Sequence, residues 1–226
     1  MNVLVLASRK GGTGKSTLAA HLAAQAHRPG KPVVLIDTDP QGSLTLWHEL
    51  RGTGEPEIRR AGRSLSDTLK QAARAGAALA IVDTPPNKSA LVTEAIRAAT
   101  LVVIPTRPAI FDLAAVEATI EMCREANRPY AVVMNACPAK RNASESQIVA
   151  DARAGLRDDK VPVWGGQITQ RSDYALSLAD GLGAREYDPG APAAAEMAQL
   201  WSAISRSLGA INGAHKAARA MHRLAA

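Results

Sequence analysis

Short apolar runs rich in Val, Ile and Leu alternate along this 226-residue chain with longer segments whose apolar residues recur at helical spacing. The short runs are continuous rather than alternating, which is typical of strands buried on both faces of a parallel sheet. The pattern predicts strands at residues 2–8, 32–37, 79–84, 100–105 and 130–136 and a weaker one at 162–168. It predicts helices at residues 15–27, 65–75, 88–98, 112–126, 143–157, 172–180 and 192–208. This alternation predicts one α/β domain, a mostly parallel twisted sheet with helices on both faces.

Two segments lie outside the alternation. Residues 51–63 contain four arginines, three glycines and one proline, and we expect a surface connection with room for a short edge strand. Residues 209–226 are basic and alanine-rich, and we expect a weakly held C-terminal helix or tail. The sequence also predicts helix N-caps at Ser64 and Asn87 and helix stops at Gly76 and Gly181.

The charge balance narrows the class of partner. The formal net charge is +6 and the isoelectric point is about 9.6, which favours phosphate-rich partners such as nucleic acid, although the charge could also serve solubility alone. Cys123 and Cys137 lack CxxC spacing and lie in or beside apolar segments, so we expect buried free thiols. Met1 leads directly into the first strand and no apolar run reaches eighteen residues, so we expect a cytoplasmic protein with neither signal peptide nor membrane span.

The most specific motif follows the first predicted strand. A glycine-rich turn between a strand and a helix points backbone N–H groups into one concavity, to which the helix adds its positive dipole end. In such a loop Lys15 would reach the β- and γ-phosphates, and Ser16 would offer its hydroxyl to Mg²⁺. The usual glycine is replaced by Arg9, and Lys10 is an additional lysine. We interpret the loop as a nucleotide-binding site formed by Lys10, Gly11, Gly12, Thr13, Gly14, Lys15, Ser16 and Thr17.

Carboxylates follow two further predicted strands. Asp37 and Asp39 come after the second strand, and Asp83 ends the strand at 79–84. Ligands bind at the carboxyl ends of strands in an open parallel sheet, so we expect these side chains beside the phosphates. One of the first pair could hold a water of the Mg²⁺ shell while the other orients the attacking water; the alternative is a helix cap at Asp37 and a turn at Asp39. Asp83 would hold Mg²⁺ through water, and residues 84–86 would sense the γ-phosphate.

Taken together, the segments KGGTGKST, DTDPQGS and VDTPP resemble the ParA/MinD family of deviant Walker-A ATPases. The stretch 103–108 with Phe111 and Asp112, and the stretch 168–171 with Tyr174, Ala179 and Gly181, are similar to the short ParA proteins (ParF type) of plasmid and chromosome partition. Those proteins begin at the phosphate loop, as this chain does. The resemblance runs from residue 2 to about residue 208 and implies a P-loop ATPase domain over residues 1–208, with residues 209–226 as the basic helix or tail.

The resemblance also implies roles for individual residues. Lys10 would cross to the nucleotide of a second subunit in an ATP-bound sandwich dimer, where a second cation would offset charge developing during phosphoryl transfer. Asp39 would position the hydrolytic water and complete a catalytic set with Lys10 and Lys15. Asp37 and Asp83 would serve the metal together with Ser16, so the expected cofactors are ATP and Mg²⁺. Asn135 would bond adenine, although relatives usually follow it with arginine and a simple strand-end role stays open.

Members of this family differ in what the dimer holds. The apolar side of the C-terminal segment is mostly alanine, without Phe or Trp, so we expect no membrane binding. We expect nonspecific binding of double-stranded DNA and association with the nucleoid; each basic residue could instead be a solvated surface charge. The candidate DNA contacts are Arg153, Arg157, Lys160, Arg171, Arg206, Lys216, Arg219 and Arg223.

The function that this resemblance implies is an ATP-dependent partition ATPase. Mg-ATP would drive homodimerisation and DNA binding, and a small DNA-bound, ParB-like adaptor would stimulate slow hydrolysis and reset the cycle. The cargo would be a plasmid or a chromosome locus. One alternative is a related ATPase that positions a protein compartment, a chemoreceptor cluster or a flagellar pole. Others are an iron–sulfur or metal-cluster carrier on the same scaffold, or a small-molecule kinase.

Overall fold

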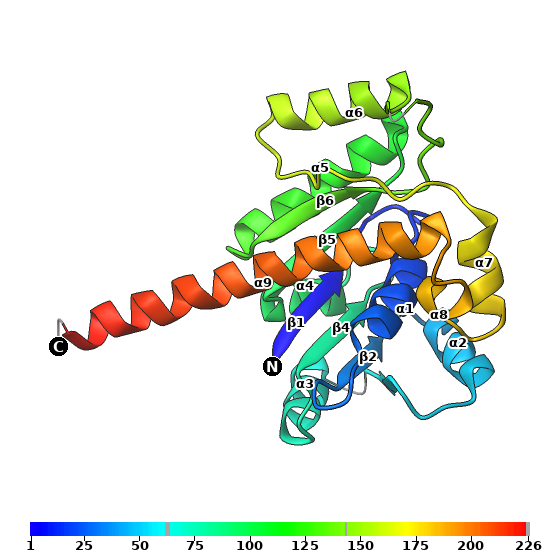
Figure 1. Cartoon of the computed structure of the whole chain (residues 1–226). Coiled ribbons are helices and arrows are strands. Elements are labelled where there is room, and N and C mark those ends of the chain that lie inside the picture. The colour runs from blue at the N-terminus through cyan, green and yellow to red at the C-terminus, as the bar shows by residue number, and fades with distance from the viewer. Residues whose placement is uncertain (62–63, 143, 225–226) are drawn as a thin grey trace.

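The computed structural model describes residues 1–61, 64–142 and 144–224 as a parallel sheet covered by helices (Figure 1). The sheet has six strands in the order β3-β2-β4-β1-β5-β6, and every neighbouring pair is parallel. The strands are β1 (Asn2–Leu6), β2 (Val33–Asp37), β3 (Glu57–Arg60), β4 (Leu79–Asp83), β5 (Leu101–Thr106) and β6 (Tyr130–Met134). The predicted fold class is confirmed.

The helices form a layer on each face of the sheet. They are α1 (Lys15–Ala26), α2 (Ser43–Arg51), α3 (Leu65–Arg74), α4 (Ala90–Ala98), α5 (Ile110–Glu125), α6 (Gln147–Asp158), α7 (Ser172–Ala179), α8 (Ala184–Tyr187) and α9 (Pro192–Leu224). Side chains of α3, α4, α5 and α6 pack in one apolar cluster, and those of α1, α2, α7, α8 and α9 pack in another. Successive residues of β1 enter opposite clusters, Val5 one and Leu6 the other, as the two-residue period of a strand requires. This is why the strands read as continuous apolar runs.

The register of the central strands determines where the site lies. The last residue of β1, Leu6, pairs with Asp83, and Asp83 also pairs with Asp37 at the end of β2. Hydroxyl groups join these ends: Thr84 donates to the carbonyl of Leu6 at 2.8 Å, and Thr38 donates to the carbonyl of Asp83 at 2.6 Å. The loops after β1, β2 and β4 therefore leave the sheet at one edge.

Five predicted strands are confirmed, whereas residues 162–168 do not form a regular strand. This segment follows the outer edge of β6 through an isolated bridge at Val163 and a bond from the Ile168 N–H to the Met134 carbonyl at 2.9 Å. Two consecutive glycines, 165 and 166, interrupt the ladder between these contacts. The edge strand allowed for in residues 51–63 is β3, and α2 and α8 are helices that the apolar pattern did not predict.

Of the four predicted helix caps and stops, three are confirmed, whereas α6 begins at Gln147 and not at residue 143 as predicted. The Ser64 hydroxyl accepts from the Asp67 N–H at 3.2 Å, and Gly76 and Gly181 follow their helices with φ of 90° and 69°. Asn87 is not an N-cap: α4 begins at Ala90, and the hydroxyl of Ser89 accepts from the Val92 N–H at 3.2 Å. Pro86 and Asn87 lie in a bend, so the helix starts at residue 90 and not at residue 88 as the sequence suggested.

The last helix, α9, runs without a break from Pro192 to Leu224 and projects well past the sheet (Figure 1). Its first half packs on α1 and the sheet through Leu200, Ile204 and Leu208. The expected helical character of the C-terminal segment agrees with this, but no helix end marks residue 208, so the division there remains a prediction. Within the described residues, none of the helices combines the length and apolar character that crossing a bilayer requires.

Candidate functional site

The loop between β1 and α1 closes around the ammonium group of Lys15. The Lys15 Nζ donates to the backbone carbonyl of Lys10 at 3.3 Å, and the Thr13 hydroxyl donates to the same carbonyl at 3.4 Å. Gly12 and Gly14 have φ of 73° and 93°, a region that glycine enters at no steric cost. A Cβ on Gly14 would also collide with the side-chain amide of Asn135. The loop therefore needs glycine for both backbone conformation and close approach.

Lys15 is a buried cation. Its side chain is 6% exposed, and burial lowers its pKa, while the nearby carboxylates of Asp83 and Asp39 oppose that shift. An ammonium group in this position has lost most of its hydration, and among the described residues it forms no ion pair within 4.0 Å. Anionic oxygens from a phosphate would replace the lost water, so the lysine is arranged to receive an anion.

Asp83 and Ser16 meet at the base of the loop. The Ser16 hydroxyl donates to Oδ2 of Asp83 at 2.5 Å. Asp83 is fully buried, and its Oδ1 has no hydrogen-bond partner among the described residues. Burial raises the pKa of this carboxyl to about 7, although the Ser16 hydrogen bond and the charge of Lys15 act in the other direction. A buried carboxylate oxygen without a partner is costly unless a cation or an ordered water faces it.

These groups fit a magnesium ion. Carboxylate and hydroxyl oxygens are the hard ligands that Mg²⁺ prefers, and Mg²⁺ usually keeps several waters and takes few protein ligands. Ser16 and the free oxygen of Asp83 would hold the ion or its waters next to the phosphates. Elsewhere in the described part of the chain, no group of three or more His, Cys, Asp or Glu side chains is arranged to hold a metal.

Asp37 is used differently from Asp83. Its Oδ2 accepts from both the N–H and the hydroxyl of Thr45, at 3.3 and 3.1 Å, and its Oδ1 accepts from the Asp39 N–H at 3.1 Å. The carboxylate thus caps the first turn of α2 and shapes the turn before it, as in the helix-cap alternative. A role of Asp37 toward the metal remains a prediction. Asp39 is partly exposed, and one of its oxygens accepts from the Gln41 N–H at 3.0 Å.

Two adjoining cavities follow the loop. One of about 320 Å³ lies on the phosphate side, and Lys15, Ser16, Asp39 and Trp47 contribute to its wall. The other, of about 430 Å³, extends toward α7 and is lined by Arg107, Asn135, Arg171 and Tyr174, among others. Both include Gly12, Gly14, Thr17 and Leu178. The shared residues make the two cavities neighbours along the loop.

Asn135 fixes the loop from the second cavity. Its Nδ2 donates to the Thr13 carbonyl at 2.6 Å, and its side chain is buried against Gly14. Asn135 thus has a specific structural role at the end of its strand, where it holds the loop. Adenine binding by Asn135 remains a prediction. The sequence predicts no role for Arg107, which lies in the stretch 103–108, yet its guanidinium lies 3.7 Å from where a Cβ on Gly12 would stand. Its place after the carboxyl end of β5 is the signal that could have assigned it to the site.

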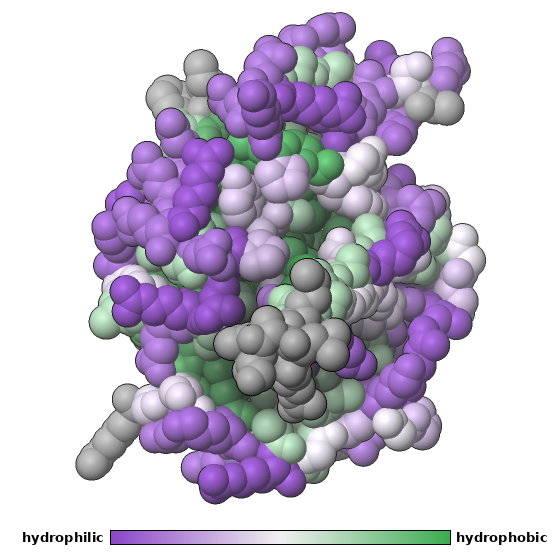
Figure 2. Space-filling model, turned by 90° about the vertical axis from the view of Figure 1, so that its left-hand side faces the viewer, coloured by the Kyte–Doolittle hydropathy of each residue, from purple (hydrophilic) through white to green (hydrophobic). Residues whose placement is uncertain are grey.

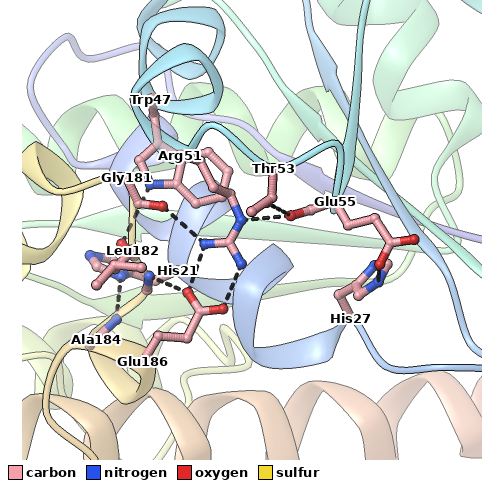
Figure 3. Close-up of polar contacts among 11 residues, drawn as sticks. His21, His27, Trp47, Arg51, Thr53, Glu55, Gly181, Leu182, Ala184 and Glu186 are labelled. Carbon is pink, nitrogen blue, oxygen red and sulfur yellow. Dashed lines mark hydrogen bonds and ion pairs between the residues drawn. The ribbon is translucent and has the colours of Figure 1, made fainter.

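A second polar cluster, which the sequence did not predict, is centred on Arg51 at the end of α2 (Figure 3). Arg51 forms a bidentate ion pair with Glu186 at 2.6 and 2.8 Å and donates to the carbonyls of Gly181 and Glu55 at 2.9 and 2.6 Å. Its guanidinium also lies 5.4 Å from the ring centroid of Trp47. Trp47 is buried and donates to the Leu182 carbonyl at 3.4 Å. These contacts attach the end of α2 to the turn between α7 and α8.

The expected DNA contacts divide by exposure. The prediction that Arg153 contacts DNA must be corrected, because only 5% of this residue is exposed. Its guanidinium binds Glu145 at 2.7 Å and the carbonyls of Trp164 and Gly166 at 2.5 and 3.0 Å. Arg171 is paired with Glu196 at 2.9 Å in the wall of the second cavity. The exposed candidates are Arg157, Lys160, Arg206 and Lys216. The side chains of Arg219 and Arg223 lie outside the described residues.

Both cysteines are buried free thiols, as predicted. Burial raises the pKa of Cys123 and of Cys137 to about 12. Thiols of this kind stay protonated near neutral pH and are poor metal ligands.

Residues 4–184 match the family model described as the CobQ/CobB/MinD/ParA nucleotide binding domain. The chain is 39% identical over 122 residues to a maintenance of carboxysome distribution protein A from Gloeobacter kilaueensis, covering 52% of this chain and 55% of that protein. It is 42% identical over 118 residues to a protein ParA from Rhizobium radiobacter, covering 50% and 51%. The chain thus spans about half the length of these relatives. Its fold matches the Aquifex aeolicus MinC:MinD cell division protein complex with a TM-score of 0.72 at 19% identity, over 91% of this chain and 96% of that one.

Proposed function

The chain belongs to the CobQ/CobB/MinD/ParA nucleotide-binding family, and we propose that it is an Mg-ATP-dependent ATPase of the ParA type that positions a cargo. The observation that carries this proposal is the loop itself. A buried lysine and a buried carboxylate with a free oxygen meet at its base, and a second lysine, Lys10, precedes its glycines. This arrangement supplies cations for a triphosphate and an oxygen ligand for its metal.

The residues act on the nucleotide in distinct ways. Lys15 and the backbone N–H groups of the loop bind the phosphates, and Ser16 and Asp83 hold the metal, with Asp37 supporting them through the turn that carries Asp39. When bound, Mg²⁺ neutralises charge on the phosphate oxygens and orients them. Asp39 lies in the wall of the phosphate-side cavity and positions the attacking water. Asn135 holds the loop and faces the base, which accounts for adenine binding.

Hydrolysis requires a second subunit. Lys10 is exposed and precedes the glycines at the mouth of the site, so it reaches the nucleotide of a partner copy in a sandwich dimer. A cation delivered there stabilises negative charge in the transition state, as an arginine finger does. ATP therefore acts as a dimerisation switch, and hydrolysis releases the two copies.

The dimer binds duplex DNA without sequence preference and places the protein on the nucleoid. It carries twice the formal charge of +6, and Arg157, Lys160, Arg206 and Lys216 are exposed to phosphates. Binding of this kind weakens steeply with salt because counterions are released. A small DNA-bound, ParB-like adaptor stimulates hydrolysis, and the cargo is a plasmid or chromosome locus.

A second candidate function is the positioning of a protein compartment. The similarity to a relative named for carboxysome distribution supports it. The ATPase cycle and the DNA surface would be the same, and only the adaptor and cargo would differ. The metal-cluster alternative gains no support, since the thiols of Cys123 and Cys137 are buried.

The test is an electrophoretic shift of random-sequence duplex with ATP, with ADP and without nucleotide. The native chain should shift the duplex only with ATP, and Lys15→Ala should abolish the shift. Lys70→Ala is the matched control, because Lys70 is an exposed lysine paired with Asp67 on α3, and it should behave as the native chain does. Equal binding in all three nucleotide states would exclude the switch. Absence of ATP hydrolysis and of nucleotide binding would exclude the proposed function as a whole.

A further inference from the structure

We propose that the groove between α5 and α6 is a docking site for the projecting end of α9 from a second copy of this chain. This contact is separate from the nucleotide-dependent sandwich. It joins unlike surfaces, a helix end on one copy and a groove on the next.

The groove is a cavity that the nucleotide site does not use. It measures about 530 Å³ and shares no lining residue with the two nucleotide cavities. Its apolar wall is formed by Leu113, Ile120, Ala152, Leu156 and Val161. Figure 2 shows this apolar hollow in green beneath the polar helix at the top of the molecule, where α6 lies in Figure 1. An open apolar groove of this size favours an apolar occupant.

The rim of the groove is acidic although the protein as a whole is basic. Glu117 of α5 and Asp151 and Asp159 at α6 contribute three carboxylates, against the single guanidinium of Arg124. Asp151 accepts from the Gln147 side chain at 2.7 Å, which leaves it a charged acceptor at the edge. The occupant should therefore carry positive charge beside an apolar stripe.

The end of α9 has this chemistry. The Asn212 amide of α9 donates to the side chain of Asn2 at 3.0 Å, and residues 213–218 beyond it are exposed. The twelve residues from 213 to 224 extend by about 18 Å at 1.5 Å per residue. This segment contains no acidic residue, whereas Lys216, Arg219 and Arg223 are basic. Figure 1 shows that it projects beyond the sheet into open space.

Its apolar stripe suits a narrow groove. Ala210, Ala214 and Ala217 are spaced by four and three residues and share one side of the helix. Methyl side chains let a helix backbone come close to two neighbouring helices, whereas larger side chains would hold it away. Lys216 lies beside this stripe and would face the rim carboxylates.

The occupant must come from another molecule. The body of α9 packs in the apolar cluster shared with α1, whereas α5 and α6 pack in the cluster on the opposite face of the sheet. A continuous helix anchored on one face does not turn back to the other. Two projecting helices would also repel each other, because their exposed charges have the same sign. The pairing of helix end with groove is heterologous, so it links copies in a ring or an open series.

The groove also has a route to the nucleotide site. The hydroxyl of Thr119, next to the lining residue Ile120, accepts from the backbone N–H of Arg9 at 3.3 Å. Arg9 directly precedes Lys10. A helix docked on α5 would thus contact the same helix whose Thr119 hydroxyl holds the start of the phosphate loop.

Disulfide formation between introduced cysteines tests the contact in the full chain. The experiment needs no nucleotide, so a failure of the docking proposal can be told apart from a failure of the ATPase proposal. Ala114→Cys lies in the groove and Ala217→Cys on the stripe, and both positions are exposed, while the native thiols are buried. Mixing the two variants under oxidising conditions should give a disulfide-linked dimer. Ala154→Cys, on α6 outside the groove, and His215→Cys, on the other side of α9, are the matched controls and should pair only at background. Equal pairing by the controls would overturn the proposal.

Charge reversal supplies an independent measurement. Lys216→Glu and Glu117→Lys should each weaken self-association in sedimentation velocity by about fivefold, and the double variant should recover part of it. Lys216→Glu could instead weaken the binding of duplex DNA while leaving disulfide pairing and sedimentation as in the native chain. That result would show that the helix end contacts DNA, and it would refute docking.

Discussion

At the scale of single residues, the nucleotide site depends on buried polar side chains whose partners are backbone groups. His21 of α1 is a case outside the loop itself. Its Nδ1 accepts from the Ala184 N–H at 3.1 Å, and its ring meets that of Tyr174 edge-on at 5.1 Å. Tyr174 lines the second cavity. The histidine thus joins the helix after the loop to α7 and α8, and it must be neutral to accept that hydrogen bond.

The pH dependence of stability should report this histidine. Burial lowers the pKa of His21 from 6.5 to about 4. Between these values the unfolded chain binds a proton that the folded chain excludes, so the free energy of unfolding falls as pH falls through the window. The contribution of His21 to this loss should reach about 3 kcal/mol near pH 4, and protonation of Asp83, whose pKa burial raises to about 7, contributes with the opposite sign over the same window. His21→Asn keeps an acceptor without titrating, so its melting temperature should rise relative to that of the native chain as pH falls from 6.5 to 4.

The exposed His215 is the matched control for this measurement. His215→Asn should keep the pH dependence of the native chain, because the side chain of His215 is exposed. An unchanged pH profile in His21→Asn would show that other groups cause the loss.

At the scale of elements, the position of α2 links the phosphate side of the site to its back wall. Its first turn is capped by Asp37, and Ser43, Leu44 and Trp47 face the phosphate-side cavity. Its last residue, Arg51, is clamped by Glu186 and by carbonyls on two other segments (Figure 3). The helix is therefore fixed at both ends, which holds Asp39 at the mouth of the site.

Removal of the Arg51 clamp should loosen this helix. Arg51→Ala should cost about 1–2 kcal/mol, because it leaves a partly buried carboxylate and two carbonyls without their donor, and it should lower the melting temperature by about 3–6 °C. The side chain of Glu186 is 35% exposed, so water screens part of the ion pair. Arg51→Lys should recover little, since one ammonium cannot replace the bidentate fork. Calorimetry of these variants checks the prediction.

Arg59 provides the comparison for the clamp. It pairs with Glu57, whose side chain is 53% exposed, and Arg59→Ala should change the stability by less than about 0.5 kcal/mol. Equal losses in Arg51→Ala and Arg59→Ala would argue against a specific role for the clamp.

At the scale of the whole molecule, the catalytic set that we propose is incomplete in one copy of the chain. Lys15, Ser16 and Asp83 converge within the copy, whereas Lys10 is exposed. The backbone carbonyl of Lys10 receives the Lys15 ammonium, so a change of the Lys10 side chain leaves that contact in place. Nucleotide binding and hydrolysis should therefore be separable.

Mixing two inactive variants tests whether Lys10 acts across the dimer. Lys10→Ala and Asp39→Ala should each bind Mg-ATP but hydrolyse little. In a mixed dimer, the Lys10→Ala subunit keeps its own Asp39 and receives Lys10 from its partner. Equal mixing should restore about one quarter of native turnover, since half of the dimers are mixed and each has one complete site. If light scattering shows dimers in the mixture but turnover does not recover, Lys10 acts on the nucleotide of its own subunit and not on that of its partner.

Much of the fold and the core of the site could be predicted from the sequence, because both depend on local patterns. Buried parallel strands need continuous apolar runs, and a phosphate loop needs glycines and a lysine at fixed spacing directly after one of them. The register of β1, β2 and β4 follows from the same burial, and it brings Asp83 to Ser16. The prediction of a weak strand at 162–168 was wrong because glycines 165 and 166 interrupt the hydrogen bonds to β6. The number of apolar residues in a segment does not reveal such an interruption.

The remaining features depend on contacts between segments far apart in the sequence. Arg153 and Arg157 look alike along the chain, yet one is buried by Glu145 and two carbonyls while the other reaches solvent. The roles of Arg51 and Asn135 likewise depend on carbonyls more than a hundred residues away. The sequence by itself determined which chemistry the chain carries and at which edge of the sheet it gathers. Only the tertiary structure decided which charges are free, because the availability of a side chain is set by what folds against it.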